Sequence, residues 1–332
     1  MFHSIQFVSF VSSYTPTSFY LSHSYIFLGV FTELLQDIGC DSVQLEELWT
    51  LDDDSLQALK DSSGAVHGLI FLFQWQNPSK AAVKKESLAE DQIPEGLFFA
   101  HQVTTNACAT QAILSVVLNA DIPTDKLGPT LGEFKEFTAS FPPALKGVAI
   151  SSSEAIKTAH NSFSRTDAFL NDTKVFSKSR DNSEDVFHFV AYLPKNGTVY
   201  ELDGLQSGPI VVGQYDDNDK DWLSVARTAI QERMVGDAIK FNLMAVLQDK
   251  RVVLKDRLAS GDETARFPLE MEDTKRAQWK LENQRRRHNF VPLCVSLLKE
   301  LAKAGKLEGL VKGATEKKQQ QRAAKKKKPN EY

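Results

Sequence analysis

A single cysteine at the start of an apolar run has the position that thiol chemistry requires. Cys108 follows three helix-capping residues at 104–106, and residues 107–118 contain no Gly or Pro, which predicts a largely buried helix. A thiol in the first turn lies near unpaired backbone N–H groups and the positive end of the helix dipole, and both favour the reactive thiolate. Gln102, which carries a side-chain amide, stands shortly before it. The competing interpretation is that Cys108 is a small buried hydrophobic residue.

A predicted β-hairpin brings a histidine and a carboxylate to one face of a sheet. Residues 186–193 have the composition of a strand, and after a Pro-Lys-Asn-Gly turn the chain returns over 198–203. His188 lies directly opposite Asp203 if the turn closes at 195–196, and diagonally if it closes one residue later. Either register leaves the two side chains within reach of each other. A core histidine satisfied by one hydrogen bond is the alternative interpretation.

Together, these side chains are the ones that nucleophilic attack on a carbonyl group needs. Cys108 attacks, His188 takes its proton and returns it to the leaving amine, and Asp203 fixes the imidazole tautomer. The amide of Gln102, beside the Cys108 backbone N–H, would complete an oxyanion hole. Four other histidines fit the role of base less well, because they lack an obvious acidic partner, precede a strand or fall on predicted helices: His101, His67, His160 and His288.

The elements that must position these groups alternate between helices and buried strands. Uncharged apolar runs of strand length are typical of strands that are covered on both faces. We expect strands at 68–75 and 241–247, helices at 31–38, 43–49, 55–60, 130–140, 151–163 and 222–234, and loops at 77–94 and 164–184. A loop as long as 164–184 inside a compact domain is uncommon, and such loops are usually functional or mobile.

The bulk composition is that of an ordinary globular protein, with 42% hydrophobic and 25% charged residues in a chain of 332. The three cysteines, Cys40, Cys108 and Cys294, stand far apart, which argues against a disulfide framework and for a reducing compartment. No Cys/His cluster has zinc-ligand spacing, so we expect no structural metal.

Charge is divided unevenly along the chain. Residues 265–332 carry 18 Lys and Arg against 8 Asp and Glu, which leaves 21 against 35 for the rest. The acidic body suggests a cationic partner, whereas the basic end could meet acidic proteins, nucleic acid or only solvent. A nucleic-acid binder is therefore one candidate function. Because no aromatic-basic stripe is present, we expect no direct nucleic-acid contact.

The two ends of the chain differ from its body. Residues 1–28 contain no Lys, Arg, Asp or Glu, and Ser, Thr and Pro interrupt them too often for a membrane-spanning helix. We expect a disordered leader or an unnatural start of the gene model; a signal peptide is the alternative, although a basic n-region is missing. At the other end we expect a polar helix at 266–288, an apolar helical segment at 290–301, a smaller amphipathic piece at 303–312 and a disordered basic tail at 313–332.

The segments around the candidate residues carry a family resemblance. Segments 102–112, 187–189 and 201–204 strongly resemble the ubiquitin C-terminal hydrolases, which are papain-like cysteine deubiquitinases, and the likeness continues at 29–34, 46–49, 68–73 and 241–245. The resemblance implies that Cys108 is the nucleophile, His188 the general base, Asp203 the third triad member and Gln102 the oxyanion glutamine. It implies hydrolysis of the peptide, isopeptide or ester bond after the C-terminal glycine of ubiquitin, without a cofactor.

The same resemblance implies an α+β fold. The expected architecture is a papain-like α–β–α sandwich with a mostly antiparallel central sheet, plus a helical C-terminal extension. The catalytic domain would span 29–255, with a crossover loop at about 164–185 arching over the active site. The extension would span 266–312 and serve partner docking.

The end of the chain resembles the long, proteasome-associated branch of the family. This implies docking to the ubiquitin-receptor subunit of the proteasome, and in the nucleus to a chromatin-remodelling complex, so we expect a cytoplasmic and nuclear protein without membrane contact. The resemblance places ubiquitin contacts at Phe31, Glu33, Leu34, Asn106 and Phe187. The apolar anchors for a partner would be Phe290, Leu293, Leu297, Leu298 and Leu301. As alternatives, this apolar segment packs back on its own body, or the chain is a catalytically restrained ubiquitin-binding subunit or scaffold.

Overall fold

The computed structural model describes residues 20–74, 86–104, 107–163, 187–216, 221–236 and 241–326, with backbone only at 20–27, 74, 235–236 and 318–326. These residues fall into two compact units, of which the first ends at Arg287 and the second begins at His288. The crossover loop predicted at 164–185 lies outside the described residues, as does most of the predicted leader.

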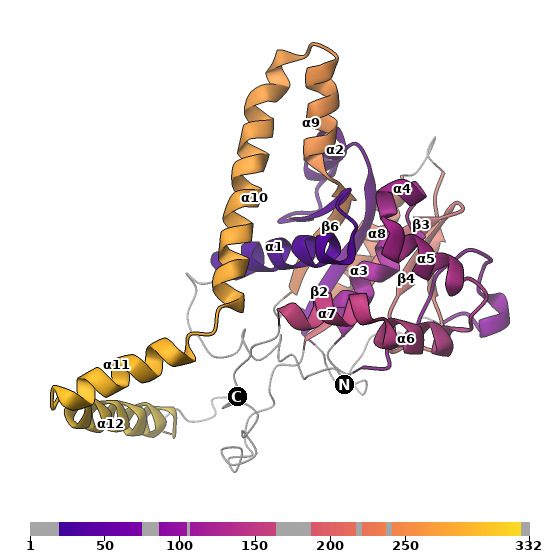
Figure 1. The fold of residues 1–332 in the computed structure, drawn as a ribbon. Helices are drawn as coiled ribbons and strands as arrows, with labels where there is room; N and C mark the ends of the chain where they lie inside the picture. The colour runs from indigo at the N-terminus through magenta and orange to yellow at the C-terminus, as the bar shows by residue number, and fades with distance from the viewer. Residues whose placement is uncertain are drawn as a thin grey trace. The chain divides into compact units, whose positions relative to one another are not determined.

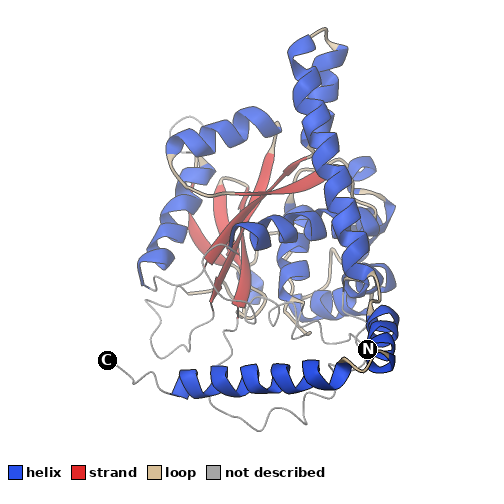
Figure 2. Cartoon of the chain, turned by 90° about the vertical axis from the view of Figure 1, so that its left-hand side faces the viewer, coloured by secondary structure: helices blue, strands red, loops and turns tan. Residues whose placement is uncertain are grey.

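Within the described residues, six strands form one antiparallel sheet in the order β1-β6-β2-β3-β4-β5 (Figure 2). The strands are β1 (Val43–Glu47), β2 (Val66–Gln74), β3 (Phe187–Lys195), β4 (Thr198–Leu202), β5 (Ile210–Gln214) and β6 (Phe241–Gln248). The strands predicted at 68–75 and 241–247 are confirmed as β2 and β6. They pair with each other at the centre of the sheet and are apolar because both of their faces are covered.

Helices cover both faces of this sheet (Figure 1). One face packs against α1 (Tyr20–Ile38), α3 (Cys108–Asn119), α5 (Pro129–Phe137) and α7 (Glu154–Ser162). The other packs against α2 (Asp53–Ser63) and α8 (Trp222–Gly236). Shorter elements join them: the 3-10 helix η2 (Glu90–Gln92), α4 (Thr124–Leu127) and α6 (Pro143–Ser152). The predicted α–β–α sandwich with an antiparallel sheet is confirmed.

The helix predicted at 43–49 is wrong, because this segment forms strand β1 at the edge of the sheet. Val43, Gln44 and Leu45 are all fully buried in this strand. The backbone N–H of Leu45 donates to Thr32 Oγ1 of α1 at 3.2 Å, and the strand pairs with β6. Five residues are too few to separate the helical from the strand period, so tertiary pairing decides the conformation.

The body extends further than the predicted boundary at residue 255. After β6 come α9 (Lys250–Ala259), the 3-10 helix η3 (Glu263–Ala265) and α10 (Arg266–Arg287). α9 and α10 run side by side as an antiparallel hairpin, and α10 packs on α1 (Figure 1). Trp279 of α10 is buried against α1, and Asn283 Nδ2 donates to the Gly29 carbonyl at 3.0 Å. The first helix of the predicted extension therefore belongs to the first unit.

The second unit consists of α11 (Val291–Lys303) and α12 (Leu307–Lys326) in its described part. The apolar helical segment predicted at 290–301 is confirmed as α11. α12 continues past residue 312, where the sequence predicts the basic tail to begin, since Ala, Lys, Gln and Glu all favour helix. No helix in the described part of the chain is long and apolar enough to cross a membrane.

Candidate active site

His188 and Asp203 form a buried hydrogen-bonded pair at the ends of two adjacent strands. β3 and β4 pair with Lys195 opposite Thr198, so the turn closes at 196–197, the second of the two registers considered from the sequence. His188 is thus a diagonal neighbour of Asp203, and its Nε2 lies 2.7 Å from Asp203 Oδ1. The predicted proximity of the two side chains is confirmed.

Asp203 is held from its own loop as well. The backbone N–H of Leu205 donates to Oδ1 at 2.9 Å, and Gln206 Nε2 donates to Oδ2 at 3.3 Å. Burial would raise the pKa of Asp203, but the hydrogen bond and charge of His188, with these two donors, lower it below its usual value. Asp203 is therefore a fixed carboxylate that orients the imidazole.

Cys108 is the first residue of α3 and meets the other side of the imidazole. Its thiol is half-buried and hydrogen-bonds to His188. Since Nε2 of His188 is engaged by Asp203, the nitrogen that faces the thiol is Nδ1. α3 packs on β3, so one helix–strand contact positions both groups. The structure therefore brings Cys108, His188 and Asp203 together from three separate elements.

The environment of His188 favours its charged form. Burial would lower the pKa of His188, but the hydrogen bonds and charges of Asp203 and Cys108 raise it to about 9. An imidazolium beside Cys108 stabilises the thiolate, which is the nucleophilic form of cysteine. The imidazole of His188 is therefore placed to exchange a proton with the Cys108 thiol.

Gln102 lies where the chain enters α3 and is fastened to the loop of Asp203. Its backbone N–H donates to the Gly204 carbonyl at 2.8 Å, and its Nε2 donates to the Thr104 carbonyl at 3.1 Å. Gly204 allows this close approach: a Cβ there would lie 3.1 Å from Gln102 Cβ and overlap Gln111 Nε2. The segment before Cys108 and the loop after Asp203 are thus locked to each other.

Two buried polar groups next to these residues were not found from the sequence. Thr110, in the first turn of α3, hydrogen-bonds to Nδ1 of His160 on α7 at 2.8 Å. Glu201, two residues before Asp203, accepts from Tyr192 Oη at 3.0 Å and forms an ion pair with Arg233 of α8. The sequence did contain a signal for the ion pair of Glu201, because a carboxylate on a buried strand requires a partner for its charge.

Comparison with known proteins decides the family. Residues 28–235 match the family described as ubiquitin carboxyl-terminal hydrolase, family 1. The chain belongs to this family. Residues 264–307 match a second model, described as ubiquitin carboxyl-terminal hydrolases, and this range contains the whole of α10 and α11.

Relatives and a solved structure agree with this membership. The chain is 42% identical over 278 residues to ubiquitin carboxyl-terminal hydrolase 2 of Schizosaccharomyces pombe, which covers 83% of this chain and 88% of that protein. It is 38% identical over 339 residues to ubiquitin carboxyl-terminal hydrolase isozyme L5 of Dictyostelium discoideum, over 87% and 93% of the two chains. The crystal structure of Trichinella spiralis UCH37 bound to ubiquitin vinyl methyl ester matches with a TM-score of 0.57 and 35% identity, over 78% and 96% of the chains.

This ubiquitin carboxyl-terminal hydrolase is a cysteine-type enzyme with a papain-like fold, as its family and structural match establish. The family resemblance stated from the sequence is therefore confirmed. The likeness to a solved structure covers 96% of that chain and so includes its C-terminal region.

Phe31, Leu34 and Phe187, three of the predicted ubiquitin contacts, are buried in this structure of the hydrolase. Phe31 and Leu34 are 1% and 2% exposed and belong to the core of α1, where Phe31 meets Phe189 edge-on. Glu33 forms an ion pair with Arg287 of α10 at 2.7 Å. Phe187 at the start of β3 is also buried, and Asn106 lies outside the described residues. Phe31 and Leu34 thus pack in the core of the first unit, and contact of these residues with ubiquitin stays a prediction.

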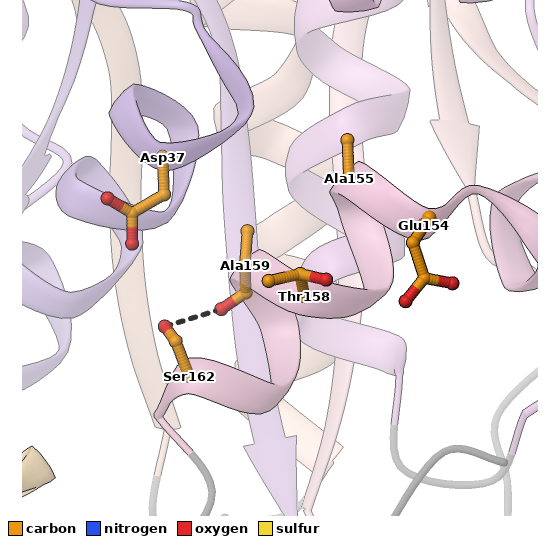
Figure 3. Close-up of a pocket in the computed structure, with 6 residues that line it drawn as sticks. All are labelled: Asp37, Glu154, Ala155, Thr158, Ala159 and Ser162. Carbon is orange, nitrogen blue, oxygen red and sulfur yellow. Dashed lines mark hydrogen bonds between the residues drawn. The ribbon is translucent and has the colours of Figure 1, made fainter.

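The pocket drawn in Figure 3 is lined by other residues than the predicted catalytic ones. It lies between α1 and α7, has a volume of about 390 Å³ and contains none of the predicted catalytic residues. Its lining residues are Asp37, Glu154, Ala155, Thr158, Ala159 and Ser162. In the described residues no group of three or more His, Cys, Asp or Glu side chains could hold a metal ion.

The predicted partner-docking residues form an exposed apolar face on the second unit. Leu293 and Leu297 are 62% and 59% exposed, and Phe290 and Leu298 are close to half exposed. Leu301 is partly covered. Phe290 is the N-cap of α11, and the leucines recur at helical spacing along it, so the helix is amphipathic with a largely exposed apolar side.

Proposed function

We propose that this hydrolase cleaves the bond after the C-terminal glycine of ubiquitin, with Cys108 as its nucleophile. The observation that carries this proposal is the double engagement of His188, which hydrogen-bonds to Asp203 on one side and to Cys108 on the other. The structural relative from Trichinella spiralis, bound to ubiquitin vinyl methyl ester, supports ubiquitin as the substrate. The excess of 35 Asp and Glu over 21 Lys and Arg before residue 265 suits a cationic ligand.

The first half of the reaction forms a thioester. His188 Nδ1 accepts the thiol proton of Cys108, and the sulfur attacks the carbonyl carbon of the terminal glycine. The resulting oxyanion accepts hydrogen bonds from the Cys108 backbone N–H and the Gln102 amide. As the intermediate collapses, the bond to the leaving amine breaks, and His188 returns the proton to that amine.

The second half releases ubiquitin. A water molecule attacks the thioester carbonyl while His188 accepts one of its protons. The carbon–sulfur bond then breaks, Cys108 leaves as the thiolate, and ubiquitin departs with a free carboxylate. Asp203 keeps the imidazole in one tautomer through both halves and stabilises the imidazolium.

The three cysteines of the chain provide an internal test of this assignment. An electrophilic ubiquitin probe, ubiquitin vinyl methyl ester, should label Cys108, which is half-buried beside His188, and neither buried Cys40 nor exposed Cys294. Peptide mass spectrometry of the labelled protein identifies the modified cysteine. Exposed Cys294 is the control for accessibility alone: modification there, with Cys108 untouched, would contradict the proposal.

The finer function concerns the second unit. We propose that the apolar face of α11 docks the ubiquitin-receptor subunit of the proteasome, and a chromatin-remodelling complex in the nucleus, which would place the protein in cytoplasm and nucleus. The support is the row of exposed anchors at Phe290, Leu293, Leu297 and Leu298, which fits a helix-in-groove mode of binding. A catalytically restrained scaffold is the alternative, and a Cys108–His188–Asp203 set with all three members in contact speaks against it.

This docking proposal is tested by substitution on one helix. Leu293→Ala with Leu297→Ala should abolish co-purification with the receptor subunit, whereas the exposed polar pair Lys299→Ala and Glu300→Ala should not. Hydrolysis of a ubiquitin amide by the chain lacking residues 288–332 should lose any response to the receptor. Retained binding by the double-leucine variant would contradict docking through this face.

A further inference from the structure

Arg233 of α8 lies behind the catalytic histidine and carboxylate, on the face of the sheet opposite α3. Its guanidinium forms an ion pair with Glu201 and stands 5.3 Å from the centre of the Phe73 ring. About a third of the Arg233 side chain is exposed, whereas Glu201 is 1% exposed. The guanidinium therefore contacts two different strands at once, β4 through Glu201 and β2 through Phe73.

The first contact leads to Asp203. Glu201 lies on β4, two residues before Asp203 and on the same side of the strand. Its two carboxylate oxygens are bound separately, Oε1 by Arg233 and Oε2 by Tyr192 Oη at 3.0 Å. Tyr192 is fully buried and pairs directly opposite Glu201 on β3. These contacts fix the end of β4 from which Asp203 extends.

The second contact leads to His188. Phe73 pairs opposite His188 in the sheet, and the two rings meet edge-on with centres 5.9 Å apart. Arg233 covers this phenyl ring in a cation–π arrangement. Phe73 is thus held between Arg233 and the imidazole, and it limits how far His188 can rotate away from the thiol.

We propose that Arg233 is a positioning residue for the His188–Asp203 pair, acting through Phe73 on the histidine and through Glu201 on the carboxylate. The inference rests on the proposed function of these two residues as base and orienting group. One guanidinium couples both halves of the pair, so its loss would misplace both in the same step. A misplacement of about 1 Å in catalytic groups lowers turnover by up to about a hundredfold.

Electrostatics agree with this geometry. Burial would lower the pKa of Arg233, but the negative charges of Glu201 and Asp203 raise it. The cation is thus stabilised by Asp203 as well as by its direct partner Glu201. Lysine would retain the charge but could neither stack as a plane on Phe73 nor present the guanidinium fork to Glu201.

The test uses four variants and one matched control. Arg233→Met removes the cation but keeps the length of the side chain, Arg233→Lys keeps only the charge, and Glu201→Gln removes the buried carboxylate. The double variant Arg233→Met with Glu201→Gln no longer buries a carboxylate without its cation, so it should recover stability. Arg227→Met is the control, because Arg227 lies on the same helix but pairs with exposed Asp53, away from the triad.

In these variants kcat and thermal stability should not change in parallel. With a ubiquitin fluorogenic amide, Arg233→Met should lower kcat by between about tenfold and about a hundredfold at unchanged KM, and Arg233→Lys should be intermediate. The double variant should regain thermal stability yet keep a reduced kcat, since Phe73 remains uncovered. If kcat recovers fully together with stability, or if Arg227→Met reduces kcat as strongly, Arg233 has a structural role alone and the proposal fails.

A second readout does not depend on ubiquitin hydrolysis. The imidazole of His188, labelled with ¹⁵N and followed by NMR in the full chain, should titrate at lower pH in the double variant Arg233→Met with Glu201→Gln than in the wild type. The double variant keeps the local net charge, so the shift reports that a displaced Asp203 holds the proton less firmly. An unchanged titration would overturn the positioning role even if the enzyme is active. A wild-type chain without ubiquitin hydrolysis would refute the proposed function but leave this comparison valid.

Discussion

Trp279 of α10 packs directly on Gly29 of α1, and a Cβ built at Gly29 would lie 2.8 Å from the indole Cγ. Lys275 and Arg276 flank the same indole, each a little over 5 Å from the ring centre. Further along α10, Asn283 donates to the Gly29 carbonyl. α10 is therefore part of the catalytic body, although it belongs to the region where the sequence predicts a separate extension.

The contact between Trp279 and Gly29 predicts how truncation of the chain before α10 and single substitutions change the stability of the fold. Trp279→Ala should destabilise the body by about 3–5 kcal/mol, because a large buried side chain leaves a cavity, and Gly29→Ala by about 1–3 kcal/mol through overpacking. Chemical denaturation measures both. Leu281→Ala on the exposed side of α10 is the control and should change stability by less than about 0.5 kcal/mol. Equal stability of the chains ending at 265 and at 287 would contradict this assignment of α10.

The raised pKa of His188 predicts a pH-dependent contribution to stability. Its folded-state pKa is about 9, above the unfolded value of about 6.5, so the pair stabilises the fold fully below about 6.5 and loses this contribution as pH rises through 9. Asp203→Asn removes the carboxylate, so the stability difference between wild type and variant should shrink from pH 6.5 to 9. Urea denaturation at several pH values measures it, and a difference that grows with pH would refute this account.

The contribution of His160 to stability should depend on pH in the opposite sense to that of His188. Burial lowers its pKa to about 4, below the unfolded value of about 6.5, so protonation of the unfolded chain destabilises the fold as pH falls through that interval. His160→Gln can still bind the Thr110 hydroxyl and does not titrate. The wild type should lose more stability than this variant between pH 6.5 and 4, as followed by urea denaturation. Parallel curves for the two proteins would show that His160 does not contribute.

Gly204 should tolerate no side chain. A Cβ at this position would overlap Gln111 Nε2 and press on Gln102, so Gly204→Ala should separate the loop of Asp203 from the segment of Gln102. We expect a loss of stability of about 1–3 kcal/mol and a lower kcat at similar KM. Gly309→Ala is the matched control, because nothing lies within 4 Å of a Cβ there. Full activity of Gly204→Ala would show that this close approach does not position the site.

Much of the site could be predicted because it depends on residue types and on the alternation of side chains along a strand, which are both local properties of the sequence. The period of two on β3 and β4 places His188 and Asp203 on one face in either register. The sequence left the register open, and the structure closes the turn at Asn-Gly, where both residues have positive φ. The helix of Cys108 was predictable from its apolar run, although its N-cap is Ala107, which makes no side-chain capping bond.

The remainder depends on contacts between distant segments. β1 is a strand because β6 offers it a partner, and five residues carry too weak a period to show this. α6 was not predicted, although Pro143 at its first position is typical of a helix start. The role of α10 could not be predicted either, because its polar sequence hides the few buried side chains, Trp279 and Asn283, that attach it to α1. Burial of such side chains is decided by the partner surface, which the local pattern does not contain.

The most direct test of the central claim is hydrolysis of a ubiquitin fluorogenic amide by Cys108→Ala, with ubiquitin binding to the same variant measured by calorimetry. If Cys108 is the nucleophile, turnover should be abolished while ubiquitin still binds, because the rest of the site is unchanged. Cys294→Ala should retain full turnover, since this cysteine lies exposed on α11. Retained turnover by Cys108→Ala would contradict the mechanism.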